Sequence, residues 1–379
     1  MLIILKKPSI YAIAIFSMFF SLPVHGYSWT CTAQDSELKI VPMPDVIEPI
    51  ALVVSKNKII IPERTHIAFY SLDNYQLEKK FGRRGEGPGE FSYPPYITAF
   101  PDFLLANTMG KLIYYSYDGD LIKETKIIIP YNYGTWPMLP VGENYVGFPL
   151  EIEKTNQGKM QLRHIGRLYD QEFKPVKQLC EAIRPLAPPP PPPPREGDKP
   201  KPTPKQDFNV IPEYVDYVIM DDKIFLADNR KGFYISVFDK QGNLLYEIAK
   251  GYKKLKVPKE YKEAYMKRQQ EHPDWESLQR QFNYKFKEIF PAFSSFKVVD
   301  AKIYMTTYEK KDEKYEMVVM DLDGEILKRS FSFPLPPYQD PSYSFTLFSN
   351  EYEIFRNKIY NLSYNLETDI YELRITPIK

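Results

Sequence analysis

The stretch DKIFLADNRKGFYISVFDKQGNLLYEIAK, residues 222–250, decides the fold. It begins with a turn residue followed by an apolar β-type run, DKIFLAD, which we call an anchor strand. A second apolar strand ends in the turn FDKQGNLL, residues 238–245, and a third strand follows it. Short strands rich in Ile, Tyr, Phe and Leu and bounded by Asp, Asn and Gly are typical of antiparallel hairpins. The stretch therefore predicts three adjacent strands of one sheet.

The same pattern recurs along the chain of 379 residues. The anchor strands read NKIIIPE (57–63), DFLLANT (102–108), NYVGFPL (144–150), DKIFLAD (222–228), AKIYMTT (301–307) and NKIYNLS (357–363). An apolar run precedes each anchor and supplies a further strand: IALVV (50–54), YITAF (96–100), WPMLPV (136–141), YVDYVIM (214–220), FSSFKVV (293–299) and FTLFS (345–349). Six units of four short antiparallel strands predict an all-β fold, a six-bladed β-propeller.

The last unit lacks an outer strand, because only DIYELRIT (369–376) remains after its anchor. An unassigned strand-like piece, ELKIVPM (37–43), lies near the other end of the chain. An open ring would leave an exposed sheet edge, which is an aggregation hazard. We therefore expect the N-terminal strand to pair with the last blade and close the ring.

Two inserts interrupt the repeat within a single propeller domain, residues 27–379. Residues 183–207 contain seven consecutive prolines, Pro188–Pro194, and predict a disordered or extended spacer, or alternatively an arm for a proline-reading partner. Residues 258–290 predict a helical insertion between blades 4 and 5, with Asp274 capping its second helix. Its apolar stripe would pack on the propeller or lid the central channel; it comprises Tyr261, Tyr265, Trp275, Leu278, Phe282, Phe286 and Phe290.

Residues 1–26 have the pattern of an export signal. Lys6 and Lys7 precede the apolar run SIYAIAIFSMFF (9–20), which is short for a membrane span, and cleavage after Gly26 is expected. No second apolar run of that length follows, so we expect a periplasmic or secreted monomer without a transmembrane span. Cys31 and Cys180 either pair in that oxidising compartment or stay as two unrelated thiols. With 50 basic and 49 acidic residues, the chain has no bulk charge that favours nucleic acid.

The glycine-rich stretch FGRRGEGPGEF, residues 81–91, raises the question of a phosphate-binding loop. It lacks the Gly-Lys-Ser/Thr of a Walker motif, and Pro94-Pro95 prevents the helix that a dinucleotide fingerprint needs. It lies where the chain must cross from the rim of the first blade to the axis of the second. We therefore interpret it as a crossover loop, in which Glu90 and Arg83 bond groups across the loop.

The run GEGPGEF (85–91) resembles the Gly-x-Gly-Pro-Gly-Glu-Phe signature of secreted bacterial six-bladed β-propeller proteins, distant relatives of the NHL-repeat propellers. LADNRKGFYISVFDKQGNLL (226–245) is similar to an NHL-type repeat, and the PAF (291–293) that ends the helical insert is similar to the same group. The resemblance covers about residues 38–379 without the proline tract. Its members are mostly uncharacterised, so the resemblance implies a fold and an exported location and little chemistry.

Crossover loops and the turns after anchor strands should share one face, which we predict to bind a protein, a peptide or a glycan. Its polar residues, for which ordinary turn chemistry is the alternative, are Arg64, His66, Arg83, Arg84, Glu86, Glu90, Asn107, Asp228, Asn229 and Arg230. No catalytic motif appears among the four histidines, the serines or the cysteines, and we assign no metal or other cofactor. The alternative is a Ca²⁺-dependent hydrolase, lactonase or lyase with an axial ion held by oxygens such as those of Glu48, Asn107, Asp228 and Asn229.

Overall fold

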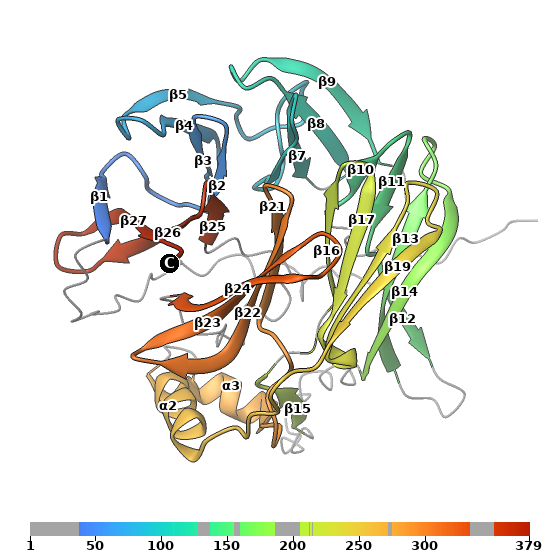
Figure 1. Ribbon diagram of the computed structural model, residues 1–379. Coiled ribbons are helices and arrows are strands. Elements are labelled where there is room, and N and C mark those ends of the chain that lie inside the picture. Colours follow the sequence, from blue (N-terminus) through green and yellow to red (C-terminus); the bar gives the residue numbers. More distant parts are fainter. Residues whose placement is uncertain are drawn as a thin grey trace, which may run out of the picture.

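A computed structural model describes residues 38–108, 110–127, 137–154, 160–185, 205–211, 213, 215–271, 275–333 and 352–379. The expected export signal, Cys31, Asp274 and the run of seven prolines lie outside the described residues. The described chain forms six antiparallel blades arranged in a ring, which confirms the predicted β-propeller (Figure 1).

The first three blades follow one another in sequence. Blade 1 contains β2 (Val53–Ser55), β3 (Lys58–Pro62), β4 (Ile67–Ser71) and β5 (Leu77–Phe81), and blade 2 contains β6 (Tyr96–Ala99), β7 (Leu104–Thr108), β8 (Lys111–Tyr115) and β9 (Leu121–Lys126). Blade 3 contains β10 (Leu139–Val141), β11 (Asn144–Gly147), β12 (Leu150–Lys154), β13 (Met160–Tyr169) and β14 (Pro175–Pro185). Strands β11 and β12 pair with successive parts of β13, so they act as one strand interrupted at Pro149.

Blades 4 to 6 complete the ring. Blade 4 contains β16 (Val215–Met220), β17 (Lys223–Asp228), β18 (Phe233–Phe238) and β19 (Leu244–Lys250), and blade 5 contains β21 (Ser295–Val299), β22 (Lys302–Lys311), β23 (Lys314–Asp321) and β24 (Ile326–Phe333). Blade 6 contains β25 (Tyr352–Phe355), β26 (Lys358–Asn365), β27 (Ile370–Pro377) and β1 (Lys39–Met43). The inner strand of blade 6 is therefore YEIF, whereas the run FTLFS (345–349) that was expected there lies outside the described residues.

The N-terminal strand β1 closes the ring as predicted. It pairs antiparallel with β27, from Lys39 opposite Ile375 to Met43 opposite Tyr371. Met43 is buried in the core between blades 6 and 1. Pro42 is tolerated because β1 is an edge strand, where a missing amide donor breaks no inner ladder. The two ends of the described chain are thus held in one sheet.

The same turn chemistry ends one strand of every blade, namely the third strand in blades 1 to 5 and the second strand, β26, in blade 6. A side-chain oxygen at the end of this strand accepts hydrogen bonds from amides two or more residues later, as Asp239 does from Gln241 and Asn243 at 2.9 and 2.8 Å. Such side-chain turns fix the hairpin and its register. The six turn residues are Ser71, Ser116, Asp170, Asp239, Asp321 and Asn365.

The core lies between neighbouring blades and not at the axis. For example, Phe225 and Ile235 of blade 4 share one apolar cluster with Phe296 and Met305 of blade 5. Successive strand residues point to opposite faces, so each blade contributes to two such clusters. The inner strands β2, β6, β10, β16, β21 and β25 surround the axis (Figure 1).

The helices α2 (Lys259–Gln270) and α3 (Trp275–Gln281) lie between blades 4 and 5 in the sequence, and Figure 1 shows them next to the lower end of blade 5. Tyr265 is buried in a cluster that reaches Tyr308 of β22, on which Phe290 stacks at 4.3 Å. The helical spacing expected for Phe282 and Phe286 is wrong. Residues 282–287, FNYKFK, alternate apolar and polar, and their first four form β20 (Phe282–Lys285), parallel to β15 (Gln206–Asn209).

Candidate functional site

Residues 82–91 form a crossover loop, and the carboxylate of Glu90 occupies the space inside it. Glu90 Oε2 accepts the Gly87 amide at 2.9 Å, and the Arg83 guanidinium pairs with the same side chain. These two contacts, the amide first, hold the pKa of Glu90 below its ordinary value. A Cβ at residue 85 would overlap the Glu90 carboxylate, which explains the glycine there. The position that a phosphate would need is therefore occupied by Glu90.

Blade 2 fastens the outer side of this loop. The buried Lys111 ammonium donates to the Gly87 carbonyl at 3.0 Å and lies 3.3 Å from the Glu124 carboxylate. Glu124 accepts the Gly89 amide at 3.0 Å, and the Tyr115 hydroxyl donates to the Gly89 carbonyl at 2.7 Å. Gly89 has a φ of +69°, a left-handed conformation that glycine adopts without strain. The loop is consequently a rigid link between blades 1 and 2.

Asn107 ties blade 2 to blade 3. Its side chain is buried and bonds both backbone groups of Met138, donating to the carbonyl at 2.9 Å and accepting from the amide at 2.9 Å. Both ends of the amide are used, so this side chain has a structural role and is not presented on the predicted binding face.

Three further predicted residues form a turn in blade 4, η1 (Asn229–Lys231). Arg230 donates two hydrogen bonds of 2.7 Å to the two oxygens of the buried Asp228, and a third, of 3.1 Å, to the Glu181 carbonyl of blade 3. Asp228 also caps the turn by accepting the Arg230 amide. Asn229 is buried, and its amide group lies 3.4 Å from the Phe293 carbonyl. These side chains join blades 3, 4 and 5.

The remaining predicted residues gather at the crossover end of blade 1. Ile67 of β4 pairs with Phe81 of β5, so the turn 63–66 and residues 82–84 leave the same sheet edge side by side. Arg64 and Arg83 have side-chain exposures of 45% and 81%, and Arg84 and Glu86 are exposed. His66 is half-buried, with Nε2 lying 3.5 Å from Oε1 of the buried Glu63. We call Arg64, Arg83, Arg84 and Glu86 the arginine patch.

Sequence reasoning missed three charged residues on the inner strands. Lys297 of β21 pairs with Glu353 of β25 at 3.0 Å across the boundary of blades 5 and 6, and Asp216 lies on β16 of blade 4. Lys297 and Glu353 occupy the same position in their inner strands, two residues before the last residue of the strand. A two-residue turn follows each of these strands. Val53, Leu139 and Val218 occupy the same position in blades 1, 3 and 4. The fold therefore accepts an aliphatic residue there and does not require charge.

These charged groups perturb one another. Burial raises the pKa of the Asp216 carboxyl to about 7, although the Tyr217 amide and Lys297 both favour its ionised form. Burial also raises the pKa of Glu353, against the opposing effect of Lys297. The pKa of Lys297 is raised because Glu353, Tyr352 and Asp216 outweigh the effect of burial. The signal available in the sequence was a single charge inside an apolar run, as in YVDYVIM and FSSFKVV.

The residues considered for an axial Ca²⁺ do not come together. Glu48 pairs with Arg64 at 3.2 Å, Asn107 is bonded to Met138, and Asp228 is bonded to Arg230. Across the described residues, no group of three or more His, Cys, Asp or Glu side chains is arranged to hold a metal ion. Burial raises the pKa of the Cys180 thiol to about 11, so this cysteine is protonated and weakly nucleophilic at neutral pH.

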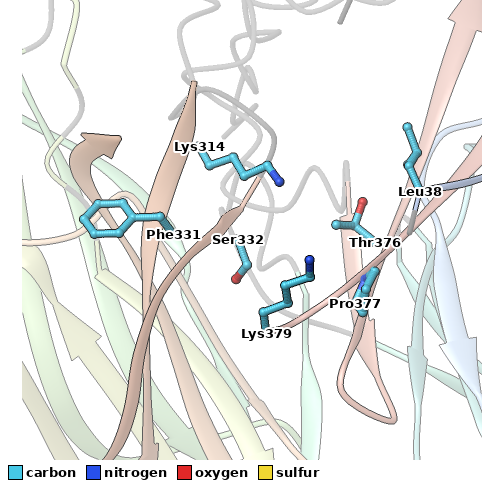
Figure 2. A pocket seen from close by; sticks show the side chains of 7 residues that line it. All are labelled: Leu38, Lys314, Phe331, Ser332, Thr376, Pro377 and Lys379. Atoms are coloured by element: carbon cyan, nitrogen blue, oxygen red, sulfur yellow. The ribbon is translucent and has the colours of Figure 1, made fainter. Parts of the chain in front are cut away.

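A hollow of about 20 Å³ lies between blades 5 and 6 (Figure 2). Lys314, Phe331 and Ser332 of blade 5 face Leu38, Thr376, Pro377 and Lys379 across it. A space of this size holds about one water molecule. It is therefore part of the blade boundary and too small for a substrate.

Comparison with known proteins identifies no family. No family model matches the chain, and no curated protein matches it. Kluyveromyces lactis Hsv2 is 10% identical with a TM-score of 0.31, and the match covers 88% of this chain and 99% of that chain. The WD40 domain of SCAP from fission yeast is 10% identical with a TM-score of 0.32, and the match covers 89% of this chain and 69% of that chain.

A protein of unknown function from Bacteroides caccae is 7% identical with a TM-score of 0.31, and the match covers 82% of this chain and 85% of that chain. Likenesses this weak carry no argument about function. The resemblance to secreted bacterial propellers, drawn from residues 85–91, stays a prediction.

Proposed function

We propose that this protein is an exported, non-enzymatic propeller that binds a protein, a peptide or a glycan through the crossover end of blade 1. The observation that carries the proposal is the arginine patch on a loop that blade 2 holds rigid. Arg83 and Arg84 leave the crossover loop directly before the part that Lys111, Tyr115 and Glu124 fasten.

A rigid loop favours binding because little conformational entropy is lost when a partner docks. Arginine offers five donors in a planar fork, and it is enriched among the residues that contribute most to interfaces. Four of the six other predicted residues, Asn107, Asp228, Asn229 and Arg230, are already committed to contacts between blades. Binding is therefore expected to depend on the arginine patch and not on these residues.

Export is part of the proposal and rests on the pattern of residues 1–26. The described residues include no helix that is long and apolar enough to cross a membrane. We propose a monomer that uses no metal or other cofactor for this function. The resemblance of residues 85–91 to secreted propellers supports the same location.

The test is binding to glycan and peptide arrays by the wild-type protein and by Arg83→Ala/Arg84→Ala. We expect the double variant to lose at least tenfold in affinity for the array members that wild type binds. The matched control is Lys174→Ala/Lys240→Ala, which removes two exposed cations from turns on the opposite face. Equal binding by wild type and the arginine variant, or an equal loss in the control, would overturn the proposal.

A further inference from the structure

Two blades place a buried carboxylate at the seventh residue of the anchor segment. This residue is Glu63 in blade 1 and Asp228 in blade 4, whereas the other four blades have Thr, Leu or Ser there. Glu63 is 2% exposed and Asp228 is 1% exposed. An ionised carboxylate that is removed from water is destabilising unless a positive charge and hydrogen bonds compensate it. Each of these two carboxylates therefore needs a cationic partner when it is ionised.

Blade 4 supplies a partner that is always charged. Arg230 donates hydrogen bonds of 2.7 Å to both oxygens of Asp228. A guanidinium group is not deprotonated in proteins, so the charge of this partner is the same at pH 5 and at pH 8. Arg230 also reaches the Glu181 carbonyl of blade 3, which ties the turn to its neighbour.

Blade 1 supplies a histidine instead. His66 Nε2 lies 3.5 Å from Glu63 Oε1, and His66 Nδ1 lies 3.2 Å from the Thr65 hydroxyl. Nε2 and Oε1 are both buried, and neither has a hydrogen-bond partner within the described part of the chain. Arg64, the cation next to Glu63 in the sequence, pairs with Glu48 at 3.2 Å. His66 is therefore the side chain that can compensate the Glu63 carboxylate, and it does so only when it is protonated.

Carboxylates and tyrosines surround this contact. Burial raises the pKa of Tyr70 on β4, and the charges of Glu63 and Asp45 raise it further. Burial and the charges of Glu48 and Glu63 raise the pKa of Tyr371 on β27 in the same way. Both tyrosines therefore stay uncharged at neutral pH. The charged and titratable groups around the contact are Asp45, Glu48, Arg64, Lys80, Tyr70 and Tyr371.

The turn that holds this contact carries one arginine of the arginine patch and adjoins the others. The Glu63 amide donates to the His66 carbonyl at 2.8 Å and closes the turn. Ile67, the next residue, pairs with the last residue of β5, so Arg64 lies at the sheet edge where residues 82–84 begin. Opening of the turn therefore moves Arg64 away from the two arginines of the crossover loop.

We propose that Glu63 and His66 form a pH-dependent ion pair that orders the turn 63–66 and, with it, Arg64 of the arginine patch. When His66 is protonated, Nε2 donates to Glu63 and Nδ1 donates to the Thr65 hydroxyl, so both buried atoms gain a partner. When His66 is neutral, Glu63 is a buried carboxylate without a counter-ion, and the turn opens to water more often. Histidine is the side chain whose charge ordinarily changes between about pH 5 and pH 8. Control of the arginine patch by this ion pair rests on the function proposed above, whereas the ion pair itself does not.

Hydrogen–deuterium exchange of the wild-type protein at pH 5.5 and pH 7.5 tests the ion pair without any ligand. After correction for intrinsic exchange rates, we expect a peptide covering 60–70 to be about fivefold better protected at pH 5.5, because a charged hydrogen bond is about twice as strong as a neutral one. A peptide covering 226–233 contains the Asp228–Arg230 pair and is the internal control, which should change by less than about twofold. Equal protection of 60–70 at the two pH values overturns the proposal.

Two variants separate the charge of residue 66 from its ability to donate a hydrogen bond. His66→Gln can donate but carries no charge, so 60–70 should show the weaker protection at both pH values. His66→Arg carries a permanent charge, as Arg230 does in blade 4, and should show the stronger protection at both. The matched control is His164→Gln, which removes a partly buried histidine from blade 3 and should keep the pH dependence of wild type. A pH dependence that persists in His66→Gln overturns the proposal.

The glycan and peptide arrays, read at the same two pH values, test the control of the arginine patch. Array members that wild type binds should bind about fivefold more tightly at pH 5.5, because an ordered turn loses less entropy on binding, and His66→Gln should abolish this difference. Equal affinities of wild type at the two pH values overturn the control of the patch. If wild type binds no array member at either pH, the function proposed for the patch fails together with its control, and the exchange data alone decide on the ion pair.

Discussion

Replacing Lys297 and Glu353 by apolar residues, singly and together, tests whether the fold requires charge at these two positions or only requires that neither charge is left without its partner. Lys297→Met leaves Glu353, whose side chain is 12% exposed, without its partner at 3.0 Å. Removing one member of a buried ion pair costs about 3–5 kcal/mol, and the partial exposure of this pair places each single variant near 3 kcal/mol. The double variant Lys297→Met/Glu353→Met leaves no stranded charge and matches the aliphatic residues of blades 1, 3 and 4. We expect it to lie within about 1 kcal/mol of wild type, or to be more stable.

The assay is urea unfolding of the four proteins in a double-mutant cycle. The control is Lys240→Met, because Lys240 also lies 3.0 Å from a carboxylate, Asp222, but both side chains are about half exposed. That variant should cost no more than about 1 kcal/mol. If the two single losses simply added in the double variant, the position would require charge for folding, and the argument from the register of the six blades would fail.

Three further predictions concern other parts of the chain. Asn107→Leu should destabilise the protein by about 2–4 kcal/mol in urea unfolding, because it leaves the buried amide and carbonyl of Met138 unpaired; a loss below about 1 kcal/mol would contradict the structural role. The free energy of unfolding of Asp216→Asn should rise relative to that of wild type from pH 4 to pH 8, by up to about 4 kcal/mol. The reason is that the carboxyl of wild type ionises near pH 4 in the unfolded chain but keeps its proton until about pH 7 in the folded one. Parallel curves of unfolding free energy against pH would refute this. Export predicts that the mature protein begins at Tyr27, and N-terminal sequencing that finds residues 1–26 retained would argue against cleavage.

The blades could be predicted because their signal is local and repeated. Every blade has one hairpin turn whose Ser, Asp or Asn side chain bonds its own backbone, and this chemistry needs no distant partner. The closing strand could also be predicted, because ELKIVPM belonged to none of the six repeats and the last repeat lacked an outer strand. The end of the helical insert was missed because FNYKFK carries the period of a strand within a segment rich in helix-forming residues.

The candidate site was harder to predict because it depends on contacts across blades. Asn107 and Asp228 look like exposed turn residues in the sequence, but Met138 and Arg230 engage them from outside their own strands. Similarly, Lys297 and Glu353 are 56 residues apart in the chain, and only the register of two inner strands brings them together. The sequence shows that a charged residue lies inside an apolar strand, but it does not show which residue pairs with it.

Hydrogen–deuterium exchange of the strand pair β1 and β27 tests the closed ring most directly. The register from Lys39 opposite Ile375 to Met43 opposite Tyr371 predicts that peptides covering 38–43 and 370–377 are both protected and lose protection together as urea is added. Complete exchange of 38–43 within seconds, with 370–377 still protected, would show that the N-terminal strand does not close the propeller.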